Sequence, residues 1–150
     1  LGEADIHRAI ESNGTHHRMI ELVPLVDQWM MDVKHYDDVK HQEWLGVSNR
    51  WTIENMKTVS AVHENMLIRV PLIPGFNDSS EDAYGFAKLF EENMDCQKAK
   101  VEFLTYHEFG KGKWEQCGME YKMARGSISP ATVKHFETVM REHGVQCIRT

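Results

Sequence analysis

The chain has 150 residues, of which 41% are hydrophobic and 27% charged, proportions typical of a folded globular domain. Its 17 Lys and Arg residues are outnumbered by 23 Asp and Glu residues, and the net charge of −6 disfavours generic binding to nucleic acid or to an acidic membrane. No apolar run approaches the roughly 20 residues that span a bilayer. We therefore expect one domain over residues 1–150, with no nucleic-acid or membrane partner.

The chain contains three cysteines, Cys96, Cys117 and Cys147, which stand far apart. An odd number at wide spacing is a poor disulfide framework and predicts free thiols in a reducing cytoplasm. The spacing also matches no metal cluster, because neither CxxC nor CxxxCxxC occurs, so no metal ligand is predicted. The sequence begins at Leu1 without an initiator Met, and we expect it to start inside a longer protein.

Short, dense apolar runs predict buried strands, and the amphipathic runs between them predict helices. In chain order, the expected strands are residues 6–10, 26–33, 66–73, 101–106 and 145–148. The expected helical faces are formed by Ile53, Met56 and Val59, then by Ala83, Phe86, Ala87 and Phe90, and last by Val133, Phe136, Val139 and Met140. This alternation predicts an α/β fold with a mostly parallel sheet, either open or an arc of a barrel.

Start and stop signals support two of these helices. Residues 78–81 (Asp-Ser-Ser-Glu) have the pattern of a capping box, which starts a helix. Ser129 offers a cap for the last helix, Pro130 fits its first position, and Gly144 supplies its end.

Residues 108–129 do not fit the alternation, because they contain four glycines and show no clear period. An irregular connection of this length in a small domain is usually functional or disordered. Its aromatic residues Phe109, Trp114 and Tyr121 favour packing against another surface. We therefore predict a lid or docking loop rather than disorder.

Polar residues follow the expected strands, at the end where parallel α/β folds bind ligands. They are Glu11, Ser12 and Asn13 at the first strand, Asp32 and Lys34 at the second, Arg69 in the third, and Tyr106 and His107 at the fourth. Carboxylate and amide oxygens accept hydrogen bonds from an ammonium group, and Lys34 and Arg69 balance a carboxylate. The set predicts a site for a zwitterionic or nucleoside-like ligand.

Each of these residues also has a purely structural interpretation. Asp32 fits a cap for the following helix, and Lys34 fits a solvated side chain. Arg69 lies in an apolar run and needs an anionic partner, which is either a ligand or an internal carboxylate such as Glu11 or Asp32. His107 by itself is typical of an ordinary loop histidine.

At these same positions the sequence resembles the glycyl-radical-enzyme activating enzymes, which belong to the radical S-adenosylmethionine (AdoMet) superfamily and are typified by the activating enzyme of pyruvate formate-lyase. Ser12 stands where that family usually has Thr. The matching segments run through the whole chain and are residues 11–14, 32–35, 41–49, 53–55, 69–78, 106–110 and 113–121.

The resemblance implies the carboxyl-terminal part of an incomplete (β/α) TIM-like radical SAM barrel. It implies a [4Fe–4S] cluster and AdoMet as cofactors, and generation of a glycyl radical on a partner enzyme such as pyruvate formate-lyase. It also implies an electron donor such as flavodoxin or ferredoxin.

Motif matching carries the family's site residues onto this chain. It implies that AdoMet contacts Glu11, Ser12, Asn13, Asp32 and Lys34 at its methionine end and His107 at its adenine. Arg69 and Lys34 are the implied catalytic residues, with Arg69 near the sulfonium or the partner's glycine loop.

The family's CxxxCxxC and the glycine-rich motif that follows it do not occur in these 150 residues. We therefore expect the isolated chain to hold neither cofactor firmly and to be inactive alone. We also expect residues 6–10 to form an exposed edge that can pair with a second copy. Two alternatives stay open: a non-catalytic module that binds AdoMet or a partner, and an unrelated α/β enzyme, such as a hydrolase, for which no nucleophile motif is found.

Overall fold

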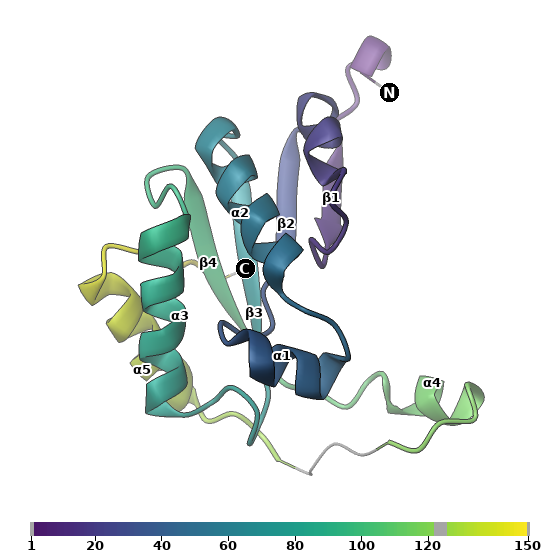
Figure 1. The fold of residues 1–150 in the computed structure, drawn as a ribbon, viewed down its shortest axis with the longest axis vertical. Coiled ribbons are helices and arrows are strands. Elements are labelled where there is room, and N and C mark those ends of the chain that lie inside the picture. The colour runs from purple at the N-terminus through teal and green to yellow at the C-terminus, as the bar shows by residue number, and fades with distance from the viewer. Residues whose placement is uncertain (1, 122–125, 150) are drawn as a thin grey trace.

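The computed structural model describes residues 2–121 and 126–149, and a parallel β-sheet lies at the centre of this part (Figure 1). The strands lie side by side in chain order, β1 (Ala9–Ser12), β2 (Gln28–Asp32), β3 (Met66–Leu72) and β4 (Ala99–Thr105). Every described strand pair is parallel. When each strand pairs with the next one along the chain, right-handed crossovers place the connecting helices on one face, as in (β/α) barrels. The predicted α/β fold with a parallel sheet is confirmed.

Helices provide the connections between the strands. α1 (Asp38–Leu45) and α2 (Arg50–Val62) join β2 to β3, and α3 (Ser80–Asn93) joins β3 to β4. α2 and α3 lie in front of the sheet in Figure 1, and α5 (Pro130–Glu142) packs beside α3. The remaining elements are η1 (Gly2–Ala4), η2 (Met19–Leu25) and α4 (Lys111–Gln116). Among the described residues, no helix has the length and apolar character needed to cross a membrane.

The core lies between the sheet and these helices. Alternate strand residues point into it, namely Trp29, Met31, Ile68, Val70, Val101 and Phe103. The predicted apolar faces of α3 and α5 are buried against them, whereas Ile53 of α2 is only half-buried. Each large apolar side chain that is fully buried contributes about 1.5–3 kcal/mol to folding, so these faces fix the helices on the sheet.

The capping signals act at the predicted helix starts, although the box of α3 lies one residue later than residues 78–81. The Ser79 side chain accepts a hydrogen bond from the N–H of Asp82, and the Asp82 carboxylate accepts one from the N–H of Ser79, which completes a capping box. Ser129 accepts a hydrogen bond from the N–H of Thr132 at the start of α5, where Pro130 is the first helical residue. These bonds satisfy donors that the first turn of a helix otherwise leaves open.

The predictions for the first and last strands were wrong in part. β1 begins at Ala9 rather than residue 6. Just before it, the Arg8 side chain pairs with both carboxylate oxygens of Asp27, and the Arg8 carbonyl accepts hydrogen bonds from the N–H groups of Asp27 and Gln28. The expected strand at residues 145–148 is reduced to one parallel bridge between Cys147 and Val101. Among the described residues, β1 pairs with β2 alone and is an edge of the sheet, as predicted.

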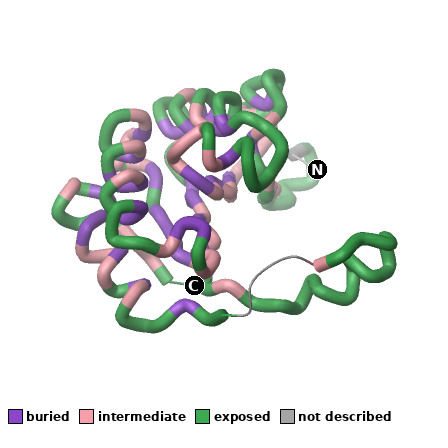
Figure 2. The backbone as a smooth tube through the Cα atoms, turned by 60° about the horizontal axis from the view of Figure 1, so that its bottom comes forward, coloured by how far each residue is buried: buried purple, intermediate pink, exposed green. Residues whose placement is uncertain are grey.

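Residues 107–120 are exposed and extend away from the sheet (Figures 1 and 2). They contain the short helix α4, which the sequence did not predict. Trp114 packs edge-on against Tyr121, and the Tyr121 hydroxyl hydrogen-bonds to that of Tyr106, whereas Phe109 is 89% exposed. We call residues 107–120 the arm. Residues 122–125 of the predicted loop lie outside the described residues.

Candidate functional site

The carboxyl end of β2 brings two predicted site residues into direct contact. Lys34 Nζ lies 2.6 Å from Asp32 Oδ2, and both side chains are about three-quarters buried. They line a cavity of about 170 Å³ together with Asn13. The other lining residues are Thr15, His41, Leu45 and Val47. The cavity therefore combines a carboxylate, an ammonium group and an amide with an apolar wall.

Register places three charged residues side by side across the sheet. Asp32 of β2 lies opposite Arg69 of β3, which lies opposite Glu102 of β4. Arg69 donates from Nε to Glu102 Oε2 at 3.1 Å, and its Nη1 lies 3.3 Å from Glu11 Oε1. Of the two internal carboxylates that the sequence suggested for Arg69, the structure shows Glu11 in contact with it. Asp32 instead pairs with Lys34.

The loop after β1 is held by buried polar side chains of α2. The Asn55 amide donates hydrogen bonds to the carbonyls of Gly14 and His16, and the Thr52 hydroxyl donates one to the carbonyl of Asn13. A buried loop carbonyl needs such a donor, since leaving it unpaired costs about 1–3 kcal/mol. These hydrogen bonds from α2 therefore fix the loop that places Asn13 in the cavity.

Buried asparagines hold the loop after β2 in the same way. The Asn49 amide donates to the carbonyls of His35 and Tyr36, and the Asn77 amide donates to that of Lys34. The backbone that carries Lys34 is thus tied both to the start of α2 and to the segment that follows β3.

His35, which follows Lys34, is a structural residue. Its ring is fully buried, and burial lowers the pKa of the imidazole. Nδ1 accepts a hydrogen bond from the N–H of Asp37, so the proton of the neutral ring lies on Nε2, 3.6 Å from Asp82 Oδ1. At that distance the two groups are not hydrogen-bonded, and Nε2 has no hydrogen-bond partner among the described residues, so the ring is held mainly by packing against Tyr36 and Phe76.

Ser12 points away from the Asp32 cavity. Its hydroxyl accepts a hydrogen bond from the N–H of Gly14 and contacts the sulfur of Met19 on the opposite side of β1. Gly14 has a φ of +69°, and a Cβ there would lie 2.8 Å from the sulfur of Met31. The Glu-Ser-Asn-Gly turn needs glycine at this position both for its backbone and for close packing.

His107 is not brought together with the other predicted site residues. It lies exposed at the base of the arm, where its ring lies tilted against that of Phe109 at 4.4 Å between centroids. No described contact joins it to Asp32, Lys34 or Arg69.

Three residues near the site were not predicted from the sequence. Glu102 is buried in β4, and its only sequence signal was an acid within an apolar run; that it lies opposite Arg69 is seen only in the structure. His41 and Thr15 line the cavity, and His41 is fixed by a 2.7 Å hydrogen bond between Nδ1 and the Val47 carbonyl. Residues 41–49 were among the segments that match the family, but nothing in the sequence indicated that His41 lies near Asp32.

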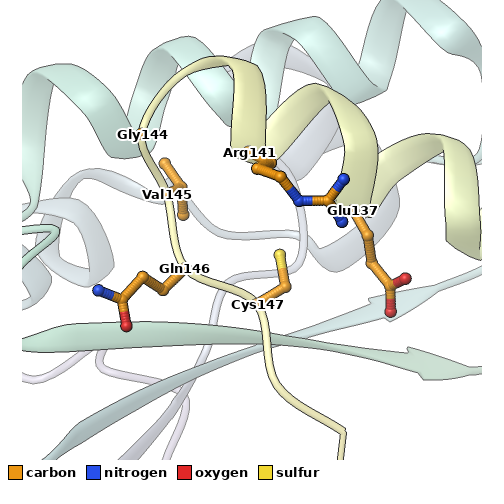
Figure 3. Close-up of a pocket in the computed structure, with 6 residues that line it drawn as sticks. All are labelled: Glu137, Arg141, Gly144, Val145, Gln146 and Cys147. Carbon is orange, nitrogen blue, oxygen red and sulfur yellow. The ribbon is translucent and has the colours of Figure 1, made fainter.

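The three cysteines do not fit an iron–sulfur cluster. Cys96 is half-buried after α3, Cys117 is exposed on the arm, and Cys147 follows α5. Figure 3 shows the Cys147 sulfur pointing toward α5, where Glu137 and Arg141 line a cavity of about 370 Å³. A cluster needs several thiolates converging on one point, and no group of three His, Cys, Asp or Glu side chains among the described residues is arranged to hold a metal.

Several curated proteins are similar in sequence to this chain. The chain is 32% identical over 142 residues to the choline trimethylamine-lyase activating enzyme of Oleidesulfovibrio alaskensis, a match covering 92% of this chain and 46% of that protein. It is 30% identical over 146 residues to the pyruvate formate-lyase 1-activating enzyme of Escherichia coli, covering 93% and 58%. This chain is a homologue of the glycyl-radical-enzyme activating enzymes. A third such relative, the 4-hydroxyphenylacetate decarboxylase activating enzyme of Clostridium scatologenes, is 28% identical over 150 residues, covering 97% and 47%.

Two solved structures share the fold of this chain. A domain of pyruvate-formate lyase-activating enzyme from Bacteroides vulgatus superposes with a TM-score of 0.76 at 20% identity, covering 98% of this chain and 83% of that domain. A radical SAM methyltransferase from Sphaerobacter thermophilus gives a TM-score of 0.63 at 17% identity, covering 93% and 39%. These likenesses support the fold. No protein-family model matches the sequence, and the chain spans about half the length of the curated relatives it matches.

Proposed function

We propose that these 150 residues supply the AdoMet-facing and partner-facing part of a glycyl-radical-enzyme activating enzyme. The observation that carries this proposal is the cavity in which Asp32, Lys34 and Asn13 converge. AdoMet ends in an amino acid, and its ammonium and carboxylate groups are complementary to a carboxylate, an amide and a lysine held at one point. Homology to the activating enzymes adds independent support.

The side chains have separable roles in this proposal. The oxygens of Asp32 and Asn13 accept hydrogen bonds from the ligand ammonium group, while Lys34 pairs with the ligand carboxylate. Arg69 presents its guanidinium beside them, toward the reacting end of the ligand or the partner's glycine loop, and His107 at the base of the arm faces the adenine. Ser12 acts indirectly, through its hydrogen bond to the turn that positions Asn13.

AdoMet, when bound in such enzymes, supplies the radical that removes a hydrogen atom from the partner's glycine. The cysteines of this chain do not fit the [4Fe–4S] cluster that this chemistry also needs, so the cluster thiolates come from residues outside these 150. The isolated chain is accordingly expected to be inactive and to bind AdoMet weakly. The partner is a glycyl radical enzyme, and the electron donor is a reductant such as flavodoxin or ferredoxin.

Saturation-transfer NMR with millimolar AdoMet tests the binding part, because it detects weak ligands. We expect transfer to the ligand methyl and adenine protons in the wild-type chain and its loss in Asp32→Asn and Lys34→Met. Lys57→Met, which removes an exposed lysine of α2 at a distance from the cavity, is the matched control and should behave as wild type. Absence of transfer in the wild type, or equal transfer in all four chains, would falsify the proposal.

The gene upstream of Leu1 separates the catalytic proposal from a non-catalytic binding module. An in-frame CxxxCxxC there supports the activating enzyme. A stop codon followed by a start site at Leu1 supports a module that binds AdoMet or a partner without chemistry.

A further inference from the structure

Glu102 is a buried carboxylate that the proposed ligand site does not contact. It lies in the middle of β4, between Val101 and Phe103, and its side chain is only 4% exposed. An ionised carboxylate in such a place is stable only when it is paired and hydrogen-bonded. Arg69, directly opposite on β3, supplies a charged donor at 3.1 Å.

The two carboxylates that bind Arg69 differ in kind. Glu102 holds the Nε end of the guanidinium from a rigid, central position in the sheet. Glu11 contacts Nη1 at 3.3 Å from the edge strand β1, and its side chain is 55% exposed. Because a ligand or solvent can replace an exposed partner more readily than a buried one, Glu102 is the fixed anchor and Glu11 the exchangeable contact.

Glu102 also bears on which carboxylate each cation of the site binds. Arg69 lies between two carboxylates in one row, Asp32 on one side and Glu102 on the other. The structure shows Arg69 bound to Glu102, while Asp32 binds Lys34 at 2.6 Å. Without the negative charge of Glu102, the nearest carboxylate in the row for Arg69 would be Asp32, which the proposed ligand needs.

We propose that Glu102 is a positioning residue. It holds Arg69 by Nε, so that the guanidinium presents its Nη groups to the ligand and leaves Asp32 to the cavity. The proposal rests on the proposed function where it concerns the ligand, but the hold on Arg69 is a property of the chain that is measured separately.

The test is the exchange rate of the Arg69 Nε proton, measured by ¹H–¹⁵N NMR in the folded chain. In wild type it should exchange about tenfold or more slowly than that of exposed Arg50, because a hydrogen bond to a charged group must open first. Glu102→Gln should remove most of this protection, and Glu102→Asp should keep part of it. The matched control, Glu11→Gln, should leave the Nε exchange nearly unchanged, because Glu11 contacts Nη1.

The second readout is AdoMet binding by saturation transfer. Glu102→Gln should weaken it about tenfold, with partial recovery in Glu102→Asp, although neither variant touches the ligand. The proposal is overturned if the Arg69 Nε proton exchanges without protection in wild type, even if Glu102→Gln does not fold. It is also overturned if Glu11→Gln loses as much Nε protection as Glu102→Gln does. Full AdoMet affinity in a folded Glu102→Gln chain overturns it as well. Failure of wild type to bind AdoMet refutes the proposed function instead, and the exchange rates still decide whether Glu102 holds Arg69.

Discussion

The buried amide of Asn77 ties together the ends of two neighbouring strands. It donates hydrogen bonds to the carbonyls of Lys34, after β2, and of Pro71, in β3, at 2.8 and 2.9 Å, and its oxygen accepts one from the N–H of Ile73. Pro71 has no N–H to offer to the ladder, and β3 ends one residue later, at Leu72, so the backbone there needs side-chain partners. The Lys34 side chain enters the site from a backbone that Asn77 fixes.

Replacing Asn77 with Ala should therefore destabilise the fold strongly. The change leaves two buried carbonyls and one N–H without their partner, and we expect a loss of about 2–4 kcal/mol in the free energy of unfolding. Urea denaturation followed by circular dichroism measures it. Asn93→Ala, which removes a single hydrogen bond to the Leu89 carbonyl, is the control and should cost about 1 kcal/mol or less. Equal losses in the two variants would contradict the role of Asn77.

Gly14 and Gly75 offer a second matched comparison. Both have positive φ, +69° and +76°, but a Cβ at Gly14 would meet the sulfur of Met31 at 2.8 Å, whereas nothing lies within 4 Å of one at Gly75. Gly75→Ala should cost about 1–2 kcal/mol for its backbone alone. Gly14→Ala should cost a further 1 kcal/mol or more, roughly, because the core must also shift. Thermal unfolding of the two variants gives the difference in their stability. A loss of stability in Gly14→Ala that is no larger than in Gly75→Ala would refute the packing argument.

Alkaline pH should destabilise the chain through two partly buried groups. Burial raises the pKa of Tyr36 to about 12 from 10.0, with the Asp82 charge adding to it, and burial raises the pKa of the Cys147 thiol to about 12 from 9.0. The unfolded chain loses these protons first, so the stabilisation is complete below pH 9 and declines as pH rises toward 12. Urea titrations at pH 8, 10 and 11 should show the decline. Tyr36→Phe should flatten it above pH 10, and an unchanged slope in this variant would argue against the Tyr36 contribution.

The three thiols should differ sharply in reactivity. Cys117 is exposed on the arm, whereas burial shields Cys96 and Cys147 from reagents and raises the pKa of both thiols. Mass spectrometry after iodoacetamide treatment should find Cys117 modified first, with Cys147 slower by roughly a hundredfold or more. In urea the three should react at similar rates. Fast modification of Cys147 in the folded chain would show that its surroundings open.

The exposed aromatic ring of the arm should add nothing to stability. Phe109 is 89% exposed, whereas Phe103 of β4 is buried against Phe136. Phe109→Ser should change the free energy of unfolding by less than about 0.5 kcal/mol, and Phe103→Ser should lower it by about 3 kcal/mol or more. Urea denaturation compares them. A large loss in Phe109→Ser would mean that the arm packs on the body of the molecule rather than serving as a lid or docking segment.

Local patterns determined much of this fold. Dense apolar runs predicted β2, β3 and β4, and the faces that carry Phe86 and Phe136 predicted α3 and α5, because burial of these side chains decides where the elements pack. The edges of the sheet were predicted less well. β1 starts only at Ala9, next to an Arg8–Asp27 ion pair that joins positions nineteen residues apart, and the strand expected at residues 145–148 is reduced to one bridge.

The candidate site, too, was predictable from the sequence only in part. The sequence by itself determined that Asp32 and Lys34 share one side of an extended segment, since side chains alternate along a strand. Only the tertiary structure decided that Arg69 binds Glu102 and Glu11 rather than Asp32, that Ser12 faces away from the cavity, and that His107 stands apart on the arm. The physical reason is that register between strands and the return of loops depend on contacts far apart in the chain, which no local pattern records.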